Sequence, residues 1–491
     1  MKIKTDREQI VVDLDGIPSD LFIGGTWREG SHTDRIDVYN PSNEELLKSV
    51  ANATIEDGLK AVDAAAGAAK AWAKTPPRQR AEVLLRAYDI MMDRSDWLAA
   101  LISLENGKAL ADAKGEVLYA AEFFRWFSEE AVRIKGELSV APSGKNRIVV
   151  DYQPMGISVL ITPWNFPAAM ATRKIGPALA AGCTCILKPA SETPLTAFAI
   201  VEILVEAGVP AGVVNAITTT TPGPVINAML NDPRVRKLSF TGSTEVGRKL
   251  LAEAAKSVVH CSMELGGNAP FIVFEDADID IAVDSAIIAK MRNGGEACTA
   301  ANRFFVHRKV MDEFAEKLAV RMGALEVNDG VLPTTACGPL VNQASLDKVS
   351  ALVDDALAKG AKLKAGGNKI QRKGYFYQPT VLANVSEESN LFREEIFGPV
   401  AALYPFETEK GVVERANDTE YGLVAYVFTT DLSRGMRVAE ELEAGMIALN
   451  RGLVSDPAAP FGGVKQSGLG REGAHHGLLE YMEAKYIAVD W

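Results

Sequence analysis

Cys298 lies in a run of small residues that suits a nucleophile that a substrate must reach. It follows Gly294 and Gly295, and Ala297 and Thr299 flank it. No bulky side chain in this run would shield the sulfur. A free thiol has a pKa of about 8.5 and is mostly protonated at neutral pH, so such a nucleophile needs a base or a positive charge nearby. The chain must therefore supply a partner for the Cys298 thiol.

Glu264 is the candidate partner, in a second glycine-rich run, M-E-L-G-G-N-A-P (263–270). A positioned carboxylate can act as a general base on a thiol or a water molecule. A structural cysteine among apolar neighbours is the alternative for Cys298. Glycine-rich runs around both residues favour the catalytic interpretation.

Asn165 is the centre of P-W-N-F-P (163–167). Two prolines fix the backbone around it, and its amide could donate to a developing oxyanion. A rigid turn, with the Asn165 side chain bonded to its own backbone, is an alternative that this segment leaves open.

Two further segments could hold an anionic cofactor. Lys188 ends a strand in I-L-K-P-A-S-E, where a ribose or phosphate would lie, although a solvated lysine is the simpler alternative. Gly242 follows a strand and permits close backbone approach, and Ser243 or Thr244 can cap the next helix, whose N-terminus suits an anion. A plain structural turn remains possible there. The G-x-G-x-x-G match at 468–473 lacks a preceding strand and is not interpreted as a dinucleotide loop.

The elements that must position these residues alternate between short β-branched runs and helical runs. From residue 157 to 240, and again from 271 to 325, this alternation predicts βαβ units and parallel sheets. Ligand sites are expected at the carboxyl ends of the strands. A helical tract over 78–133 is expected to break near residue 106. The segment 137–153 reads as a hairpin without a core of its own, a candidate for subunit pairing.

Composition narrows the class of protein. The chain has 491 residues, 47% of them hydrophobic, which is enough for two or three domains. A net charge of −12 argues against nucleic acid or an anionic membrane as the main partner. Five cysteines indicate a reducing compartment, and the N-terminus has no apolar leader, so we expect a cytoplasmic protein. We expect no metal site, since no cysteine or histidine pair has a second pair at zinc-site spacing.

These motifs together resemble those of the aldehyde dehydrogenase superfamily over nearly the whole chain. The resemblance rests on M-E-L-G-G-N-A-P, G-E-A-C (295–298), E-E-I-F-G-P-V (394–400) and P-F-G-G-V-K-Q-S-G-L-G-R-E (460–472). It implies an α/β fold with two Rossmann-like parallel-sheet domains and a small β oligomerisation element. The implied divisions are 1–134 with 154–263 for the dinucleotide, 264–465 for catalysis, and 135–153 with 478–491 for assembly into a homodimer or homotetramer.

The resemblance also implies roles for individual residues. Cys298, Glu264 and Asn165 would be catalytic. Glu395 would hold the nicotinamide ribose, and the residues that would line NADP or NAD are Trp164, Lys188, Ser191, Gly242, Ser243, Leu265, Glu395 and Phe397.

Within the superfamily, the succinate-semialdehyde dehydrogenase branch is the most similar, through F-P-A-A-M-A-T-R-K-I-G-P-A-L-A-A-G-C-T and R-N-x-G-x-x-C. Arg173, Arg292 and Ser455 would then hold a substrate carboxylate. Arginine suits that role, because it stays charged and binds carboxylates bidentately. The expected reaction is oxidation of succinate semialdehyde, or a similar ω-carboxylated aldehyde, through a cysteine thiohemiacetal and thioester.

Two positions depart from the branch. Glu296 replaces the commoner glutamine and would raise the pKa of Cys298 if it pointed inward. Ala300 stands where a second cysteine is frequent, so no regulatory disulfide is expected. Alternatives within the family are glutarate semialdehyde or a broad range of aldehydes. A cysteine hydrolase or esterase is an alternative of another class, and it would need a histidine partner such as His260 or His307.

Overall fold

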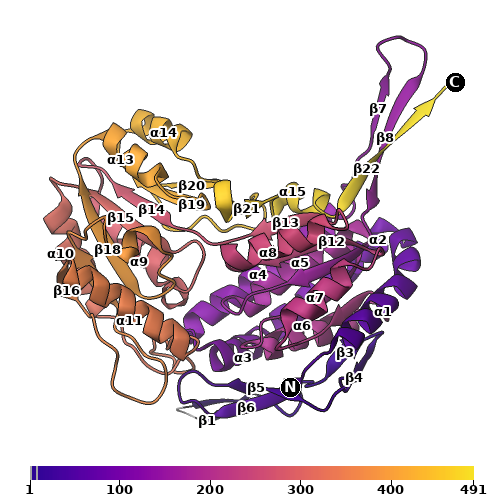
Figure 1. Ribbon diagram of the computed structural model, residues 1–491, viewed down its shortest axis with the longest axis horizontal. Helices are drawn as coiled ribbons and strands as arrows, with labels where there is room; N and C mark the ends of the chain where they lie inside the picture. The colour runs from indigo at the N-terminus through magenta and orange to yellow at the C-terminus, as the bar shows by residue number, and fades with distance from the viewer. Residues whose placement is uncertain (1–2, 7–8, 491) are drawn as a thin grey trace.

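The computed structural model describes residues 3–6 and 9–490. Two α/β parts lie side by side and a narrow β arm projects from one of them (Figure 1). None of the helices in these described ranges is long and apolar enough to cross a membrane.

The first part is built on an eight-stranded sheet of order β21-β13-β12-β9-β10-β11-β3-β4. Its five central strands are parallel and almost entirely buried, as expected for runs rich in Ile, Val and Leu. Antiparallel β3, β4 and β21 close its edges. The strands are β3 (Leu21–Ile23), β4 (Thr26–Arg28), β9 (Ile157–Ile161), β10 (Thr184–Lys188), β11 (Val214–Ala216), β12 (Val235–Thr241), β13 (His260–Glu264) and β21 (Gly468–Leu469).

Helices cover both faces of this sheet and bury two hydrophobic clusters against it. One face packs against α1 (Ile55–Lys74), α7 (Pro222–Leu230) and α8 (Thr244–Ala255). The other packs against α2 (Pro77–Asp93), α3 (Ser95–Asn106), α4 (Leu110–Glu130), α5 (Pro167–Ala181) and α6 (Pro194–Glu206). The expected break near residue 106 is present, at left-handed Gly107. A further break at Arg94 was not foreseen, because no glycine or proline marks it.

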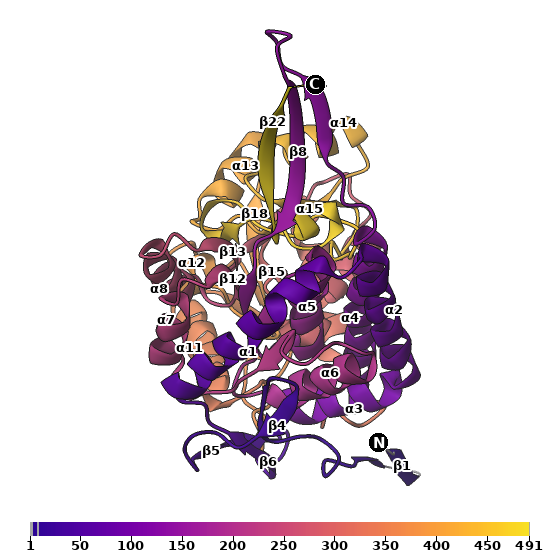
Figure 2. The same ribbon diagram turned by 90° about the vertical axis from the view of Figure 1, so that its right-hand side faces the viewer.

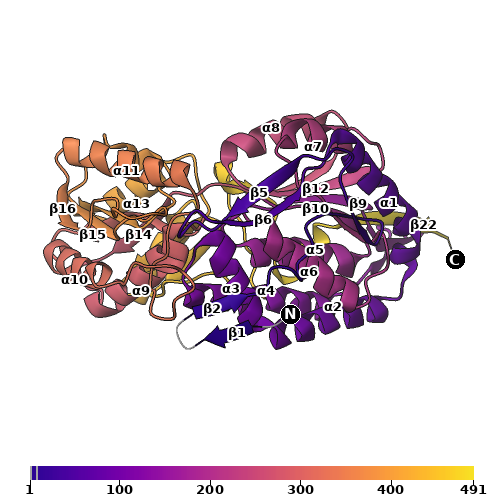
Figure 3. The ribbon, with the colours of Figure 1, turned by 90° about the horizontal axis from the view of Figure 1, so that it is seen from below.

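The second part contains a seven-stranded sheet of order β16-β17-β18-β15-β14-β19-β20, seen beside the first in Figure 3. All its strand pairs are parallel except β16 with β17. The strands are β14 (Ala269–Val273), β15 (Ala301–His307), β16 (Lys362–Ala365), β17 (Thr380–Ala383), β18 (Val400–Phe406), β19 (Val424–Phe428) and β20 (Met446–Leu449). Helices α9 (Ile279–Met291) and α10 (Met311–Gly323) pack on one face, and α11 (Gln343–Ala358), α12 (Asn390–Arg393), α13 (Glu409–Asn417) and α14 (Leu432–Glu441) on the other.

The arm is a three-stranded antiparallel sheet of order β22-β8-β7. It joins β7 (Glu137–Val140) and β8 (Arg147–Pro154) to β22 (Met482–Val489). The arm projects from the body in Figure 1, and Figure 2 shows the same strands from a second side, where they overlap α13 and α14. The expected hairpin is thus present, with Gly144 left-handed in its turn. The remaining elements are β1 (Ile3–Asp6), β2 (Gln9–Val12), β5 (Arg35–Tyr39), β6 (Leu46–Ala51) and α15 (Ala474–Leu479).

Parallel topology gathers the motifs at one edge of the first sheet. The chain leaves β9, β10, β12 and β13 toward Asn165, Lys188, Gly242 and Glu264, respectively. Cys298 reaches the same region from the loop between α9 and β15 of the second sheet. The two α/β parts therefore each contribute one side of the site.

Candidate active site

The loop that carries Cys298 is shaped by residues in unusual backbone conformations. Asn293, Gly294 and Gly295 have φ values of 53°, 58° and 83°, in the left-handed region that suits glycine and is tolerated by asparagine. A Cβ atom on Gly295 would lie 2.2 Å from the carbonyl oxygen of Gly398. The glycines before the cysteine are therefore required by the close approach of these two backbones.

Cys298 is half-buried and lines a cavity of about 260 Å³ together with Asn165, Leu265 and Phe397. Burial raises the pKa of its thiol to about 12. The positive charges of Arg173 and Arg292 oppose this shift. The resting thiol is therefore protonated at neutral pH, and the two nearby positive charges favour the thiolate that attack requires.

Glu264 ends β13, with its carboxyl almost completely buried. Its Oε2 atom has no hydrogen-bond partner among the described residues. Burial raises the pKa of Glu264, the negative charge of Glu472 adds to this, and Arg173 and Lys174 oppose it. A buried carboxyl with a raised pKa and a free oxygen can hold and release a proton, as a general base must.

Arg173 is not a free cation. Its guanidinium is 1% exposed, forms an ion pair with Glu472 and lies 4.3 Å from the ring centroid of Phe461. Lys174 also binds Glu472, at 2.6 Å. The family resemblance implies that Arg173 binds a substrate carboxylate, whereas in the structure it is paired with the carboxylate of Glu472.

Arg292 and Ser455 do come together. Nη1 of Arg292 lies 3.5 Å from the hydroxyl oxygen of Ser455. The guanidinium also lies 4.7 Å from the ring centroid of Phe166 and 5.7 Å from that of Tyr119. Within the described ranges, no carboxylate is within ion-pair distance of Arg292. These two polar groups and Tyr119 line a cavity of about 410 Å³.

Asn165 is buried, and its Nδ2 donates to the carbonyl of Glu296 at 3.1 Å. An amide has two N–H donors, so one remains for a ligand in the Cys298 cavity. The Glu296 carboxyl accepts from the backbone N–H of Val341 at 3.2 Å. Burial raises the pKa of Glu296 to about 8, which keeps it protonated at neutral pH. The carboxylates that raise the Cys298 pKa are Glu395 and Glu264.

The cavity at Cys298 suits a dinucleotide. Of the residues expected at the cofactor, those that line this cavity are Trp164, Gly242, Ser243, Leu265, Glu395 and Phe397. The buried Thr241 hydroxyl at its wall has no partner among the described residues. Ser243 caps α8, and a free helix N-terminus attracts phosphate.

Lys188 and Ser191 lie outside the lining of the Cys298 cavity. Lys188 ends β10, where burial lowers its pKa and Glu192 opposes that shift. The Ser191 hydroxyl donates to the carbonyl of Thr219 at 3.4 Å.

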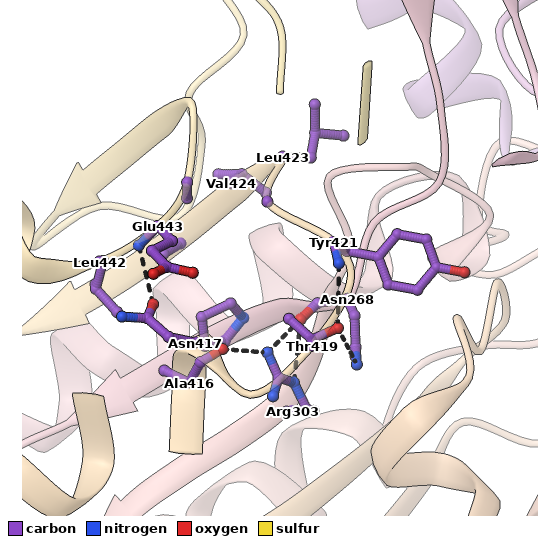
Figure 4. A pocket seen from close by; sticks show the side chains of 14 residues that line it. Asn268, Arg303, Ala416, Asn417, Thr419, Tyr421, Leu423, Val424, Leu442 and Glu443 are labelled. Atoms are coloured by element: carbon purple, nitrogen blue, oxygen red, sulfur yellow. Dashed lines mark hydrogen bonds between the residues drawn. The ribbon is translucent and has the colours of Figure 1, made fainter. Parts of the chain in front are cut away.

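A third, much smaller cavity surrounds Arg303, but the protein itself satisfies this cation (Figure 4). Its guanidinium donates to the carbonyls of Asn268 at 2.9 Å and Ala416 at 2.7 Å. The space there is about 10 Å³, roughly one water molecule. Arg303 thus ties the strand after Cys298 to the glycine-rich segment after Glu264, and the cavity is structural.

The histidines that a cysteine hydrolase would need are engaged elsewhere. His260 Nδ1 lies 2.9 Å from Nζ of Lys237, and His307 Nε2 lies 3.2 Å from the carbonyl of Glu407. Neither lines the cavity at Cys298. Among the described residues, no group of three His, Cys, Asp or Glu side chains could hold a metal ion.

Glu472, Lys174 and Tyr119 are part of the site, although the sequence analysis did not single them out. Lys174 is completely buried in a helix that is mostly apolar, and a charge in such a segment is a signal that it has a buried partner. Glu472 comes from the C-terminal segment, and Tyr119 is one of several aromatic residues on α4, so neither carries a local signal.

Known proteins place this fold and site in one family. Residues 27–487 match the aldehyde dehydrogenase family. A succinate-semialdehyde dehydrogenase of Paenarthrobacter nicotinovorans is 52% identical over 90% of this chain and 99% of its own length. A glutarate-semialdehyde dehydrogenase of Pseudomonas putida is 47% identical over 95% of this chain and 97% of its own. A crystal structure of an NADP-dependent enzyme of Escherichia coli has a TM-score of 0.96 at 47% identity, covering 98% of this chain and 99% of that one.

The chain belongs to the aldehyde dehydrogenase family. The expected family, its α/β fold with parallel sheets, and an oxidoreductase activity on aldehydes are therefore confirmed. The expectation of NADP or NAD agrees with the NADP dependence stated for the Escherichia coli structure.

Proposed function

We propose that this protein oxidises succinate semialdehyde, or a similar ω-carboxylated aldehyde, to the dicarboxylic acid with NADP or NAD. The observation that carries the substrate class is the Arg292–Ser455 pair, because Arg292 faces a cavity and forms no ion pair with a carboxylate of the described residues, although Asp112 lines the same cavity. A charge-assisted bond to such a cation favours substrates with a distal carboxylate. The succinate- and glutarate-semialdehyde dehydrogenases among the relatives support the same class.

Cys298 is the proposed nucleophile. Its thiolate attacks the aldehyde carbon, and the carbonyl oxygen becomes an oxyanion that accepts from the free Asn165 N–H and from the backbone N–H of Cys298. The thiol proton is released to water as the thiolate forms, and Glu264 is kept for the later hydrolysis step. Arg173 favours the thiolate through its positive charge.

The bound nicotinamide ring supplies the acceptor for the hydride that leaves the substrate carbon. Glu264 then takes a proton from the water molecule that hydrolyses the thioester on Cys298. The negative charge of Glu472 and the burial of Glu264 raise the pKa of this base toward the pH at which it must work.

The cofactor is proposed to lie in the Cys298 cavity, across Trp164 and Phe397, with Glu395 at the ribose. Glu395 accepts from the backbone N–H of Gly267 at 3.0 Å, which fixes its carboxyl. Ser191 has a small hydroxyl and Lys188 a positive charge, a combination that admits the 2′-phosphate of NADP. Glu192 opposes it, so both dinucleotides are expected to work.

The arm is the proposed site of assembly into a homodimer or homotetramer. Leu138, Val140, Tyr486 and Ile487 on its strands are all exposed, between 44% and 66%. Exposed apolar side chains on a projecting sheet suit a subunit interface. A monomer measured by light scattering at working concentration would contradict this assignment. The proposed parts are 1–134 with 154–263 for the dinucleotide, 264–465 for catalysis, and 135–153 with 478–491 for assembly.

A cytoplasmic location is also proposed, because the five cysteines are all unpaired.

A panel of aldehydes with and without a distal carboxylate tests the proposed function. Initial rates of cofactor reduction should be highest for the succinate and glutarate semialdehydes. One methylene group changes the binding free energy in a pocket by about 1–3 kcal/mol, so the kcat/KM values of these two substrates are expected to differ by no more than about 200-fold. Equal kcat/KM for neutral aldehydes of the same length would contradict the substrate class.

A further inference from the structure

A fully buried ion pair supports the P-W-N-F-P loop. Lys108 and Glu116 are both 0% exposed in their side chains, and Nζ of Lys108 lies 2.6 Å from Oε2 of Glu116. The same ammonium donates to the carbonyl of Asn165 at 2.6 Å and lies 4.0 Å from the ring centroid of Phe166. Its positive charge is thus directed at the backbone of one residue in the active site.

The second oxygen of Glu116 fixes the helix that follows. Oε1 accepts from the backbone N–H groups of Ala168 at 2.8 Å and Ala169 at 3.2 Å. These groups belong to the first turn of α5, which begins at Pro167, two residues after Asn165. One ion pair therefore holds both the carbonyl of Asn165 and the start of the next helix.

Asn293 joins this arrangement to the loop of the nucleophile. Its Nδ2 donates to the carbonyl of Asn165 at 2.8 Å and to the carbonyl of Glu296 at 3.0 Å. The Asn165 amide donates to the same Glu296 carbonyl. The Asn165 carbonyl thus accepts from two buried donors, Lys108 and Asn293. These bonds fix the Asn165 loop relative to the Cys298 loop.

We propose that Lys108, held in place by Glu116, is the positioning residue for the Asn165 amide in the oxyanion site. The inference rests on the proposed function, in which Asn165 donates to the oxyanion. Lys108 acts by fixing the backbone from which that amide projects. Loss of the charged bond lets the carbonyl rotate and moves the amide away from the oxyanion. A misplacement of about 1 Å can lower a catalytic rate by about 10²-fold.

A purely structural ion pair is the competing explanation, because breaking a buried pair also destabilises a protein. Glu105 supplies a matched control for stability. Its completely buried carboxyl accepts from the backbone N–H groups of Leu195 and Thr196, both at 2.8 Å, at the start of α6. Glu105 thus fixes a helix start as Glu116 does, and no hydrogen bond joins it to Asn165.

A double-mutant cycle tests the inference. Lys108→Met is made both in the native enzyme and in the Asn165→Ala variant. For each protein, two quantities are measured: the rate of the first burst of cofactor reduction and the affinity for NADP. In the native background we expect the burst rate to fall about 10–100-fold with NADP affinity unchanged. In the Asn165→Ala background we expect a change of less than about twofold, because the group being positioned is gone.

An equal fall in both backgrounds, or no fall in the native enzyme, would overturn the inference. A fall of similar size in Glu105→Gln would also overturn it, because that variant loosens a helix start without removing a donor to the Asn165 carbonyl. If Asn165→Ala alone keeps the native burst rate, the proposed role of Asn165 is wrong, a result distinct from failure of the Lys108 step. Should Lys108→Met not fold, Glu116→Gln goes through the same cycle, since it keeps an oxygen for α5.

Discussion

The guanidinium of Arg173 is paired with the carboxylate of Glu472, and both side chains are almost completely buried. Because Glu472 is paired with Arg173, the positive charge of Arg173 is not available to bind a substrate carboxylate. The ion pair also places Arg173 where its charge acts on the pKa values of Glu264 and Cys298. In the proposed mechanism, Arg173 therefore acts on the pKa values of the two reacting groups, and Arg292 is the cation proposed to meet the substrate carboxylate.

Replacement of Arg292 by Gln should lower kcat/KM for carboxylated aldehydes about 10–100-fold, the equivalent of about 1.5–3 kcal/mol for a lost charged hydrogen bond. Neutral aldehydes of the same length should keep their rates within about threefold. Steady-state kinetics over the aldehyde panel measures both effects. Arg173→Gln is the matched comparison and should lower the rates of all aldehydes together. A uniform loss in Arg292→Gln would remove this residue from substrate recognition.

Replacement of Glu264 by Gln should separate acylation from hydrolysis. The variant has no base to activate water, so steady-state turnover should fall about 10²–10⁴-fold. A first burst of reduced cofactor, close to one per active site, should remain visible by stopped-flow absorbance, because acylation of Cys298 does not use this base. Unchanged steady-state turnover would exclude Glu264 as the hydrolytic base.

Glu296 predicts how stability depends on pH. Burial raises its folded pKa to about 8, against about 4.3 in an unfolded chain. The protonated carboxyl therefore contributes its full share to the free energy of unfolding below the unfolded pKa. Between the unfolded pKa and about pH 8, where the folded group ionises, this contribution falls by up to about 1.4 kcal/mol per pH unit. Glu296→Gln removes this titration. The thermal midpoint of the variant, relative to the native protein, should therefore be higher at pH 9 than at pH 5.

Exposed Glu388→Gln is the control for that experiment, and its difference from the native protein should not vary with pH in this range. A pH-independent difference for Glu296→Gln as well would show that the carboxyl is already ionised in the folded protein.

Ser191 is expected to govern the choice between dinucleotides. Ser191→Asp places a negative charge beside Lys188 and should repel the 2′-phosphate of NADP. The ratio of kcat/KM for NADP to that for NAD should fall about tenfold or more, about 1.4 kcal/mol. Ser191→Asn has a similar volume without the charge and should change the ratio much less. Equal ratios in the two variants would place the phosphate elsewhere.

The fold, and the places in it of the proposed catalytic residues, could be predicted because their signals are local. Strands with continuous apolar runs define the parallel sheets, and the residues that follow them, such as Asn165 and Gly242, are placed by topology alone. Cys298 and Glu264 lie in glycine-rich segments whose need for close backbone contacts is visible in the sequence.

The partners of these residues could not be predicted, because they come from distant segments. Glu472 reaches Arg173 from near the C-terminus, and the Lys108–Glu116 pair meets Asn165 from α4 and the turn before it. No periodicity links such residues, so only the packed structure shows that Arg173 is already occupied and that Arg292 is not. The break at Arg94 was also missed, since no glycine or proline marks the end of α2 there.

The covalent intermediate on Cys298 is the central claim. It is tested most directly by mixing Glu264→Gln with NADP and succinate semialdehyde, quenching in acid, and measuring the mass of the peptide that contains Cys298. We expect that peptide to gain the mass of one succinyl group, and to gain nothing when Cys298→Ala is added to the variant. An unmodified Cys298 peptide after a full burst of NADPH, or turnover in Cys298→Ala, would contradict the account.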